Sequence, residues 1–228
     1  MPLLHEVRRQ ETESEVVLGS YDRIFGPDRD PVDQPGTATG TPGNWWTVMA
    51  NVPDILDHAT KGFAVMRQAD RVLGGQLKEL GRLRAAWAVQ SQFVFSQHCK
   101  AGRAEGLTDE QIDAIPNWEI ASCFSEKERA FLAFADALAL QHGRVAPGLA
   151  SRLTELSSDS EILEFTYSTL TYILHATMCR ALRLEFDDVD ERIVEVAAPE
   201  GFEQLDVNAV ISARETSRPT GLGMPFGT

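Results

Sequence analysis

The chain has 228 residues, of which 43% are hydrophobic and 24% are charged, as in an ordinary globular protein. Its 21 Lys and Arg residues face 34 Asp and Glu residues, which gives a formal net charge of −13. Because nucleic-acid binding relies on clustered Lys and Arg, this balance argues against a nucleic-acid partner. The length fits one domain, or two small helical halves that share a core.

We expect neither a membrane span nor a signal peptide. The most apolar stretch, 165–184, is interrupted by His175, Arg180 and Arg183, and it falls short of about 20 consecutive apolar residues. The N-terminus lacks a basic segment followed by an apolar core. The three cysteines form no Cys-x-x-Cys pair, which favours a reducing, cytoplasmic setting; they are Cys99, Cys123 and Cys179.

Three regions are expected along the chain. Residues 1–44 are predicted to form an N-terminal arm, with a possible short helix over 6–16 and little core, followed by an irregular loop over 26–44. A loop of that length is usually either functional or disordered. Residues 45–200 are predicted to form a helical domain. Residues 201–228 are read as a tail, either disordered or lying across a neighbouring subunit.

The apolar spacing from residue 51 onward matches the helical period of 3.6, and no stretch predicts a strand. Capping patterns support several of the helix starts, above all Thr108 with Gln111 and Ser125 with Glu128. We therefore predict an all-α fold. The expected helices cover 51–66, 76–89, a segment from Ser91 or Gln92 to Gly106, a short helix from Thr108, 126–141 and 160–184.

The most informative feature is the separation of Glu79 from His98. In one straight helix these two groups would lie ~28 Å apart. A break near residues 89–91 would produce two helices and could bring the two side chains together. Each residue also has a structural interpretation: His98 as a packed core histidine, and Glu79 as the partner of Arg82 at i+3.

This segment resembles the core motif of the alkyl hydroperoxidase D / carboxymuconolactone decarboxylase superfamily. In that family a Glu near the start of one helix is followed nineteen residues later by a His in the next. The matching motifs lie within roughly 45–190: Gly106-Leu107-Thr108-Asp109-Glu110-Gln111-Ile112, 124–130, 134–138 and 180–184. The resemblance implies an AhpD-like helical fold and an oligomer, as a dimer, trimer or hexamer.

The chain departs from both branches of the family. In the peroxidase branch a Cys-x-x-Cys lies seven and four residues before the His, where this sequence has Ser91 and Val94. Thiol peroxidase chemistry needs those thiols, so we do not expect it. In the decarboxylase branch the position four before the His is typically Glu, which Val94 also replaces.

Apolar side chains around His98 predict a pocket for an aromatic or alicyclic substrate. We expect Trp87, Phe93 and Phe95 near the imidazole. Trp46, which follows the long loop, could cap a pocket, fix a subunit contact or pack in the core. Burial would lower the pKa of His98 and an ionised Glu79 would raise it, which could leave the imidazole as a general base near neutral pH.

A polar stripe runs along the last predicted helix: Glu164, Ser168, Thr171, Tyr172, His175 and Cys179. Buried polar groups need partners, so the stripe lines either an interface or internal network, or a pocket wall that includes His175. The acidic run 185–191 has no calcium-loop periodicity and is read as a solvated helix end. No metal-ligand spacing or nucleotide-binding loop is present, so we expect no metal and no cofactor.

Together these features predict a cytoplasmic homo-oligomer with cofactor-independent lyase or decarboxylase activity on a small aromatic-derived or lactone acid. Glu79 and His98 are the predicted catalytic residues, and the predicted substrate-binding residues are Trp46, Trp87, Phe95, Tyr172 and His175. Two alternatives remain open at this point. One is a hydrolase or isomerase that uses the same base, and the other is a non-catalytic binding protein of the same fold.

Overall fold

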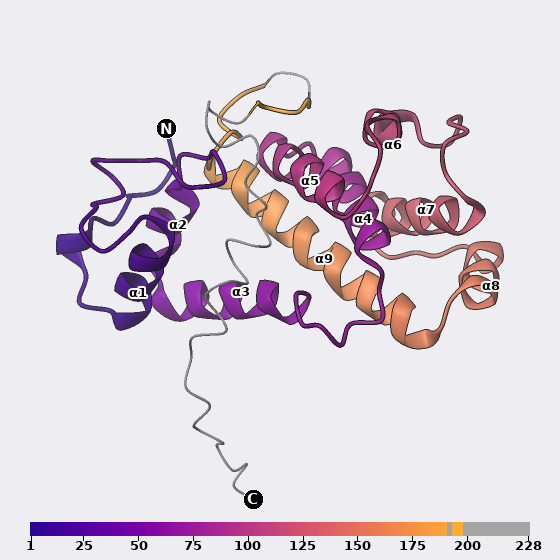
Figure 1. The fold of residues 1–228 in the computed structure, drawn as a ribbon, viewed down its shortest axis with the longest axis horizontal. Helices are drawn as coiled ribbons and strands as arrows, with labels where there is room; N and C mark the ends of the chain where they lie inside the picture. The colour runs from indigo at the N-terminus through magenta and orange to yellow at the C-terminus, as the bar shows by residue number, and fades with distance from the viewer. Residues whose placement is uncertain (191–192, 198–228) are drawn as a thin grey trace, which may run out of the picture.

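The computed structural model describes residues 1–190 and 193–197, and within them it is helical, with no strand (Figure 1). The predicted all-α class is confirmed for this part of the chain. Two short 3-10 helices, Arg9–Glu11 and Ile115–Asn117, accompany the α-helices. These are α1 (Glu15–Ile24), α2 (Asn44–Met49), α3 (Pro53–Val65), α4 (Gly75–Ala88), α5 (Gln92–Ala104), α6 (Asp109–Ala114), α7 (Glu126–Leu140), α8 (Pro147–Leu156) and α9 (Asp159–Leu182).

α9 runs through the middle of the molecule, with α1, α2 and α3 on one side of it and α4 to α8 on the other (Figure 1). α4 packs against α5, α7 and α9. This arrangement puts α4 at the centre of the larger core, where Leu80 and Leu83 are fully buried. Gly81 permits the close approach of α9, since a Cβ there would lie 2.6 Å from the Phe165 ring and 2.8 Å from the Thr169 hydroxyl.

The helix starts follow the predicted caps. Thr108 and Gln111 form a capping box at α6, and Ser125 and Glu128 form one at α7. Ser158 accepts a hydrogen bond from the Glu161 backbone at the start of α9. These local hydrogen bonds satisfy backbone N–H groups that the first turn of a helix leaves without a partner, which is why the sequence alone locates them.

The N-terminal arm differs from its prediction. Its helix covers 15–24 instead of 6–16, because the earlier backbone is held by other elements: Val7 N–H donates to the Thr47 carbonyl and Arg9 N–H to Asp30. The arm also contributes a second hydrophobic cluster, where Val17 and Tyr21 are completely buried. The expectation that this arm adds little core is therefore wrong.

The acidic run after α9 is also not a solvated end. Glu185 is 8% exposed, and its two carboxylate oxygens accept hydrogen bonds from the backbone N–H groups of Gly43 (2.8 Å) and Trp45 (2.7 Å) at the start of α2. Asp187 is 4% exposed and accepts from the Ser91 hydroxyl (2.6 Å) and from Phe93 N–H (3.0 Å) at the start of α5. Both carboxylates thus cap helix N-termini, where the helix dipole favours negative charge.

The loop over 26–44 contains turns and no helix before Asn44. The Arg29 guanidinium donates to three successive backbone carbonyls, those of residues 34–36, which holds the loop in a compact bend.

The segment 193–197 lies along α5. Val196 exchanges hydrogen bonds with the Ser96 hydroxyl, and Glu195 pairs with Arg103. The predicted tail, 201–228, lies outside the described residues. None of the described helices has the length and hydropathy needed to cross a membrane.

Two helical glycines give a matched test of the α4–α9 packing. We expect Gly81→Ala to destabilise the fold by about 1–3 kcal/mol, because the added methyl overlaps Phe165. Gly19 in α1 has open space around it, so Gly19→Ala should stabilise by about 0.5–1 kcal/mol through helix propensity. Urea unfolding of both variants measures the difference. Equal stability of the two would contradict the close approach.

Glu185 gives a pH-dependent prediction. Burial raises the pKa of Glu185 to about 7, although the two backbone N–H donors oppose this shift. The folded state then binds a proton that the unfolded state releases near pH 4.5, so the contribution of Glu185 to stability falls as the pH rises from 4.5 to 7. We expect the stability difference between Glu185→Gln and the wild type to move in favour of the variant across this window. A difference that is constant with pH, in urea titrations at pH 5, 6, 7 and 8, would refute the assignment.

Candidate functional site

The predicted break between the two central helices is confirmed. α4 ends at Ala88, Gln90 adopts a left-handed backbone with φ of 62°, and Ser91 caps α5 by accepting from Val94 N–H at 3.2 Å. The chain reverses there, so the two helices pack side by side. As a result, Nδ1 of His98 lies 2.5 Å from Oε2 of Glu79, and both side chains are buried.

The hydrogen bond fixes the tautomer of His98. An ionised carboxylate only accepts hydrogen bonds, so Nδ1 carries the proton and donates it to Glu79. In the neutral imidazole, Nε2 therefore holds the lone pair. No hydrogen bond between described residues engages Nε2. This nitrogen is the one that could accept a proton from a bound molecule.

Arg82 binds the other oxygen of the same carboxylate. Its Nη1 donates to Oε1 of Glu79 at 2.7 Å, and its Nε donates to the Ser168 hydroxyl on α9 at 3.0 Å. Glu79, which is 1% exposed, is thus held between a guanidinium and an imidazole. A buried carboxylate needs such partners, because its desolvation is otherwise too costly.

The charges of this trio follow from their surroundings. Burial opposes the ionisation of Glu79, but Arg82 and then His98 outweigh it and lower the pKa of Glu79 to about 2. Burial lowers the pKa of His98 below its ordinary value, against the opposing effect of the Glu79 carboxylate. At neutral pH the site therefore holds an ionised Glu79 and a neutral His98, the form in which an imidazole acts as a base.

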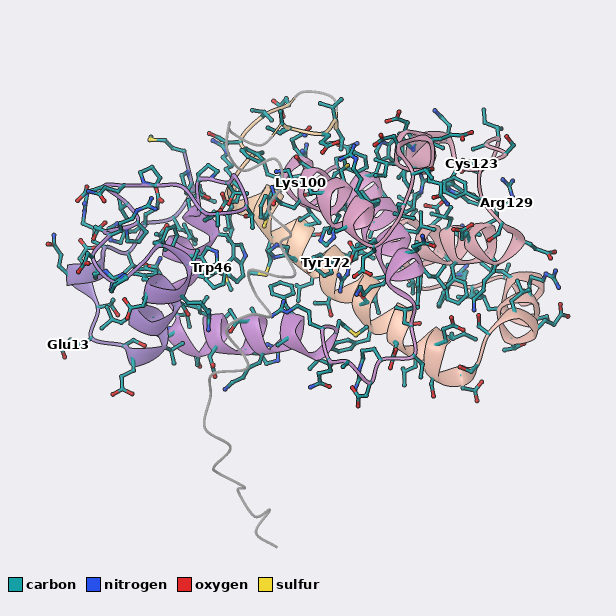
Figure 2. The ribbon with its side chains drawn as sticks, viewed as in Figure 1. Glu13, Trp46, Lys100, Cys123, Arg129 and Tyr172 are labelled. Atoms are coloured by element: carbon teal, nitrogen blue, oxygen red, sulfur yellow. The ribbon has the colours of Figure 1, made fainter. Side chains whose placement is uncertain are left out.

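Tyr172, on α9, lies near the centre of the molecule, as its label in Figure 2 shows. Its ring meets the His98 ring at a centroid distance of 4.4 Å and an angle of 87°. The guanidinium carbon of Arg82 lies 4.4 Å from the centre of the same ring. Burial raises the pKa of Tyr172, so the phenol keeps its proton beside a neutral imidazole.

His175 lies one turn further along α9, inside an aromatic cluster. Its ring centre is 5.4 Å from Trp45, 5.0 Å from Phe63 and 5.8 Å from Phe93. Tyr172 is the fourth aromatic neighbour, at 5.9 Å, and so links this cluster to His98. Burial, and to a smaller extent His98, lower the pKa of His175 to about 3, so this imidazole is neutral as well.

The remaining predicted binding residues make no ring contact with His98 among those found between described residues. Trp46 contacts the cluster indirectly, since its ring packs at 4.9 Å on Trp45. Phe95 is buried within the larger hydrophobic core. Trp87 lies about 12 Å along α4 from Glu79, packs against Arg84 at 4.8 Å, and lines a separate cavity of about 360 Å³ together with Arg180.

Ser91 and Val94, the residues aligned with the two thiols of the peroxidase branch, have structural roles in this chain. The Ser91 hydroxyl caps α5 and donates to Asp187, and Val94 is buried in the core. Cys99 does not replace the missing thiols, because burial raises the pKa of its thiol to about 12. The Cys179 sulfur lies 3.9 Å from Nε2 of His175, yet burial raises its pKa well above the ordinary value. Neither thiol is a thiolate at neutral pH.

Sequence reasoning missed two parts of the site. Arg82 was recognised only as an alternative partner for Glu79, whereas the structure gives Glu79 both partners at once. Phe63 was not singled out, although it contacts both Tyr172 and His175. Its helical spacing from Leu56 and Ala59, which pack in the same hydrophobic cluster, was the available signal. Among the described residues, no group of three or more His, Cys, Asp or Glu side chains could hold a metal ion.

Comparison with known proteins places this geometry in context. Residues 53–137 match the carboxymuconolactone decarboxylase family, a segment that contains both Glu79 and His98. The search of curated proteins found no match.

Three solved structures share the fold. A protein of unknown function from Agrobacterium tumefaciens, associated with the antioxidant defence protein AhpD, has a TM-score of 0.56 at 20% identity, over 64% of this chain and 96% of that one. An uncharacterized peroxidase-related protein from Ralstonia eutropha JMP134 with an AhpD core has a TM-score of 0.56 at 18% identity, over 61% and 74%. A variant of the debrominase Bmp8 in complex with 2,3,4-tribromopyrrole has a TM-score of 0.59 at 14% identity, over 81% and 91%.

At these identities the structures show the fold alone, and that fold is AhpD-like. The helical architecture, the paired Glu79 and His98 on adjoining helices, and the match over 53–137 agree with one another. Over residues 53–137 the chain is thus similar to the carboxymuconolactone decarboxylase family, and its fold is that of AhpD-like proteins.

Proposed function

We propose that the chain is a cofactor-independent lyase of the decarboxylase type, acting on a small aromatic-derived or lactone acid. One observation carries this proposal: a buried, neutral His98 is oriented by an ionised Glu79 at 2.5 Å, with no thiolate beside it. That pair can move a proton but cannot supply the thiol chemistry of a peroxidase or a thiol-dependent reductase.

In the proposed reaction, the bond between the substrate carboxylate and its carbon breaks and CO2 leaves. The electron pair left on that carbon then takes up one proton, which is drawn from solvent overall. Nε2 of His98 would abstract or return the proton, while Glu79 stabilises the transient imidazolium. Tyr172, whose raised pKa keeps its phenol protonated, would hydrogen-bond the substrate or act as a second acid.

The aromatic cluster around His175 supports an aromatic or alicyclic substrate. Four aromatic rings surround this imidazole, and a flat ring packs well against such surfaces. His175 would contact a polar group of the substrate. Trp46 would act by holding Trp45 in place.

We expect Glu79→Gln and His98→Ala each to lower kcat/KM by about 10²–10⁴-fold, as for loss of a general base. The assay measures CO2 release from a panel of lactone carboxylic and aromatic carboxylic acids. His58→Ala is the matched control, because this exposed histidine lies on α3 away from the site.

Full turnover by both Glu79→Gln and His98→Ala would refute the proposed mechanism. Turnover of a panel member without CO2 release would point to a hydrolase or isomerase that uses the same base. Binding of panel members without any turnover would point to a non-catalytic binding protein.

The same proposal includes a cytoplasmic homo-oligomer. The outer face of α9 carries four exposed apolar side chains at steps of four, three and four residues, the spacing of a helix–helix seam. They are Leu163 (68% exposed), Tyr167 (46%), Leu170 (43%) and Leu174 (61%). A second copy of the chain could cover this face.

We expect Leu174→Glu to shift the molecular mass in solution from an oligomer toward the monomer, because the charge would be buried in the seam. Ile120→Glu is the control, since Ile120 is 89% exposed and lies outside α9. Light scattering coupled to size-exclusion chromatography measures both masses. An unchanged mass for Leu174→Glu would exclude this face as the interface.

A further inference from the structure

Arg82 connects α4 with α9 from a buried position. It is 6% exposed and reaches Oε1 of Glu79 on its own helix, the Ser168 hydroxyl on α9 and the face of the Tyr172 ring. Two hydrogen bonds and one cation–π contact therefore fix the guanidinium. An Arg held at several points in this way defines the orientation of the carboxylate it binds.

Glu79 and His98 together are called the dyad below. The other titratable groups near the dyad come from α4, from α9 and from the segment that follows α3. Lys78 on α4 has its own partner in Glu105 at 3.5 Å. Tyr172 and His175 on α9 are neutral at physiological pH. Arg67, which follows α3, acts electrostatically on Tyr172. Among the described residues, Arg82 is the only arginine or lysine that forms an ion pair with Glu79.

We infer that Arg82 is a positioning residue for the proposed reaction: it keeps the Glu79 carboxylate ionised and aimed at Nδ1 of His98, and so sets the base that the substrate meets. The inference rests on the proposed function for its kinetic consequences. Its electrostatic consequences can be measured in the protein without substrate.

Loss of the Arg82 charge has a definite sign. A nearby cation lowers the proton affinity of Glu79 and of His98 alike, and it is among the causes of the lowered pKa of each. Removing it raises the apparent pKa of the dyad, whichever of the two groups takes the proton. A protonated dyad has no free base, so the acidic limb of the rate profile should move to higher pH.

The test is a titration of the His98 imidazole by NMR in the full chain, with His98→Ala to assign the signal. We expect Arg82→Gln to raise the apparent pKa of the dyad by about 1 unit or more, as for the loss of a close opposite charge. Arg82→Lys keeps the charge but cannot bind Glu79 and Ser168 together, so it should raise the apparent pKa less and partly rescue the profile.

Arg84→Lys is the matched control. Arg84 is equally buried on the same helix, but it pairs with Asp136 and not with the dyad, so its substitution should leave the titration of His98 unchanged. Where a substrate from the panel is turned over, the acidic limb of the pH profile of kcat/KM should shift to higher pH in Arg82→Gln by the same amount as the apparent pKa measured by NMR. In this variant kcat should fall by a larger factor than KM rises.

An apparent pKa that stays at the wild-type value in folded Arg82→Gln would overturn the inference. If Arg82→Gln does not fold, Arg82→Lys decides, and a wild-type titration curve for that variant would overturn the inference as well. A failure of the proposed function would look different, because the wild type would then turn over no acid of the panel while the NMR titrations still shifted.

Discussion

The site depends on one buried carboxylate with two partners. Glu79 lies in the second turn of α4 and is buried, so a lone charge there would destabilise the core; it is tolerated because Arg82 and His98 each bind one of its oxygens. Glu79 thus needs both partners in place. The reversal between α4 and α5 brings His98 to Glu79, and the contact between α4 and α9 brings Ser168 to Arg82. The packing of three helices and the chemistry of the imidazole are therefore consequences of the same charge.

Features encoded over three or four residues could be predicted from the sequence. The break before Ser91, the capping boxes at Thr108 and Ser125, and the start of α9 at Ser158 all depend on local hydrogen bonds. Features that depend on distant partners could not. The acidic run 185–191 has the composition of a solvated helix end. The partners of Glu185, however, are backbone N–H groups at the start of α2, about 140 residues earlier in the chain.

The site divides in the same way. The spacing of Glu79 and His98, with the break before Ser91, predicted that these two side chains could meet, and they do. The polar stripe predicted that Tyr172 and His175 share one face of α9, where their rings lie 5.9 Å apart. The sequence could not show that Trp87 points to a separate cavity, because its position depends on the rotation of α4 within the core. The Ser91 hydroxyl caps α5 and donates to Asp187, so a Ser91→Cys substitution would also cost a structural hydrogen bond.

The turn after α9 has a mechanical consequence. Glu185 and Asp187, two residues apart, hold the first turns of α2 and α5, and those two helices supply the Trp45 and Phe93 rings that contact His175. The two walls of the aromatic cluster are thus tied to one short piece of backbone. A movement that separates Trp45 from Phe93 would have to break one of these carboxylate caps or deform the turn itself, so the turn limits how far the aromatic cluster can open.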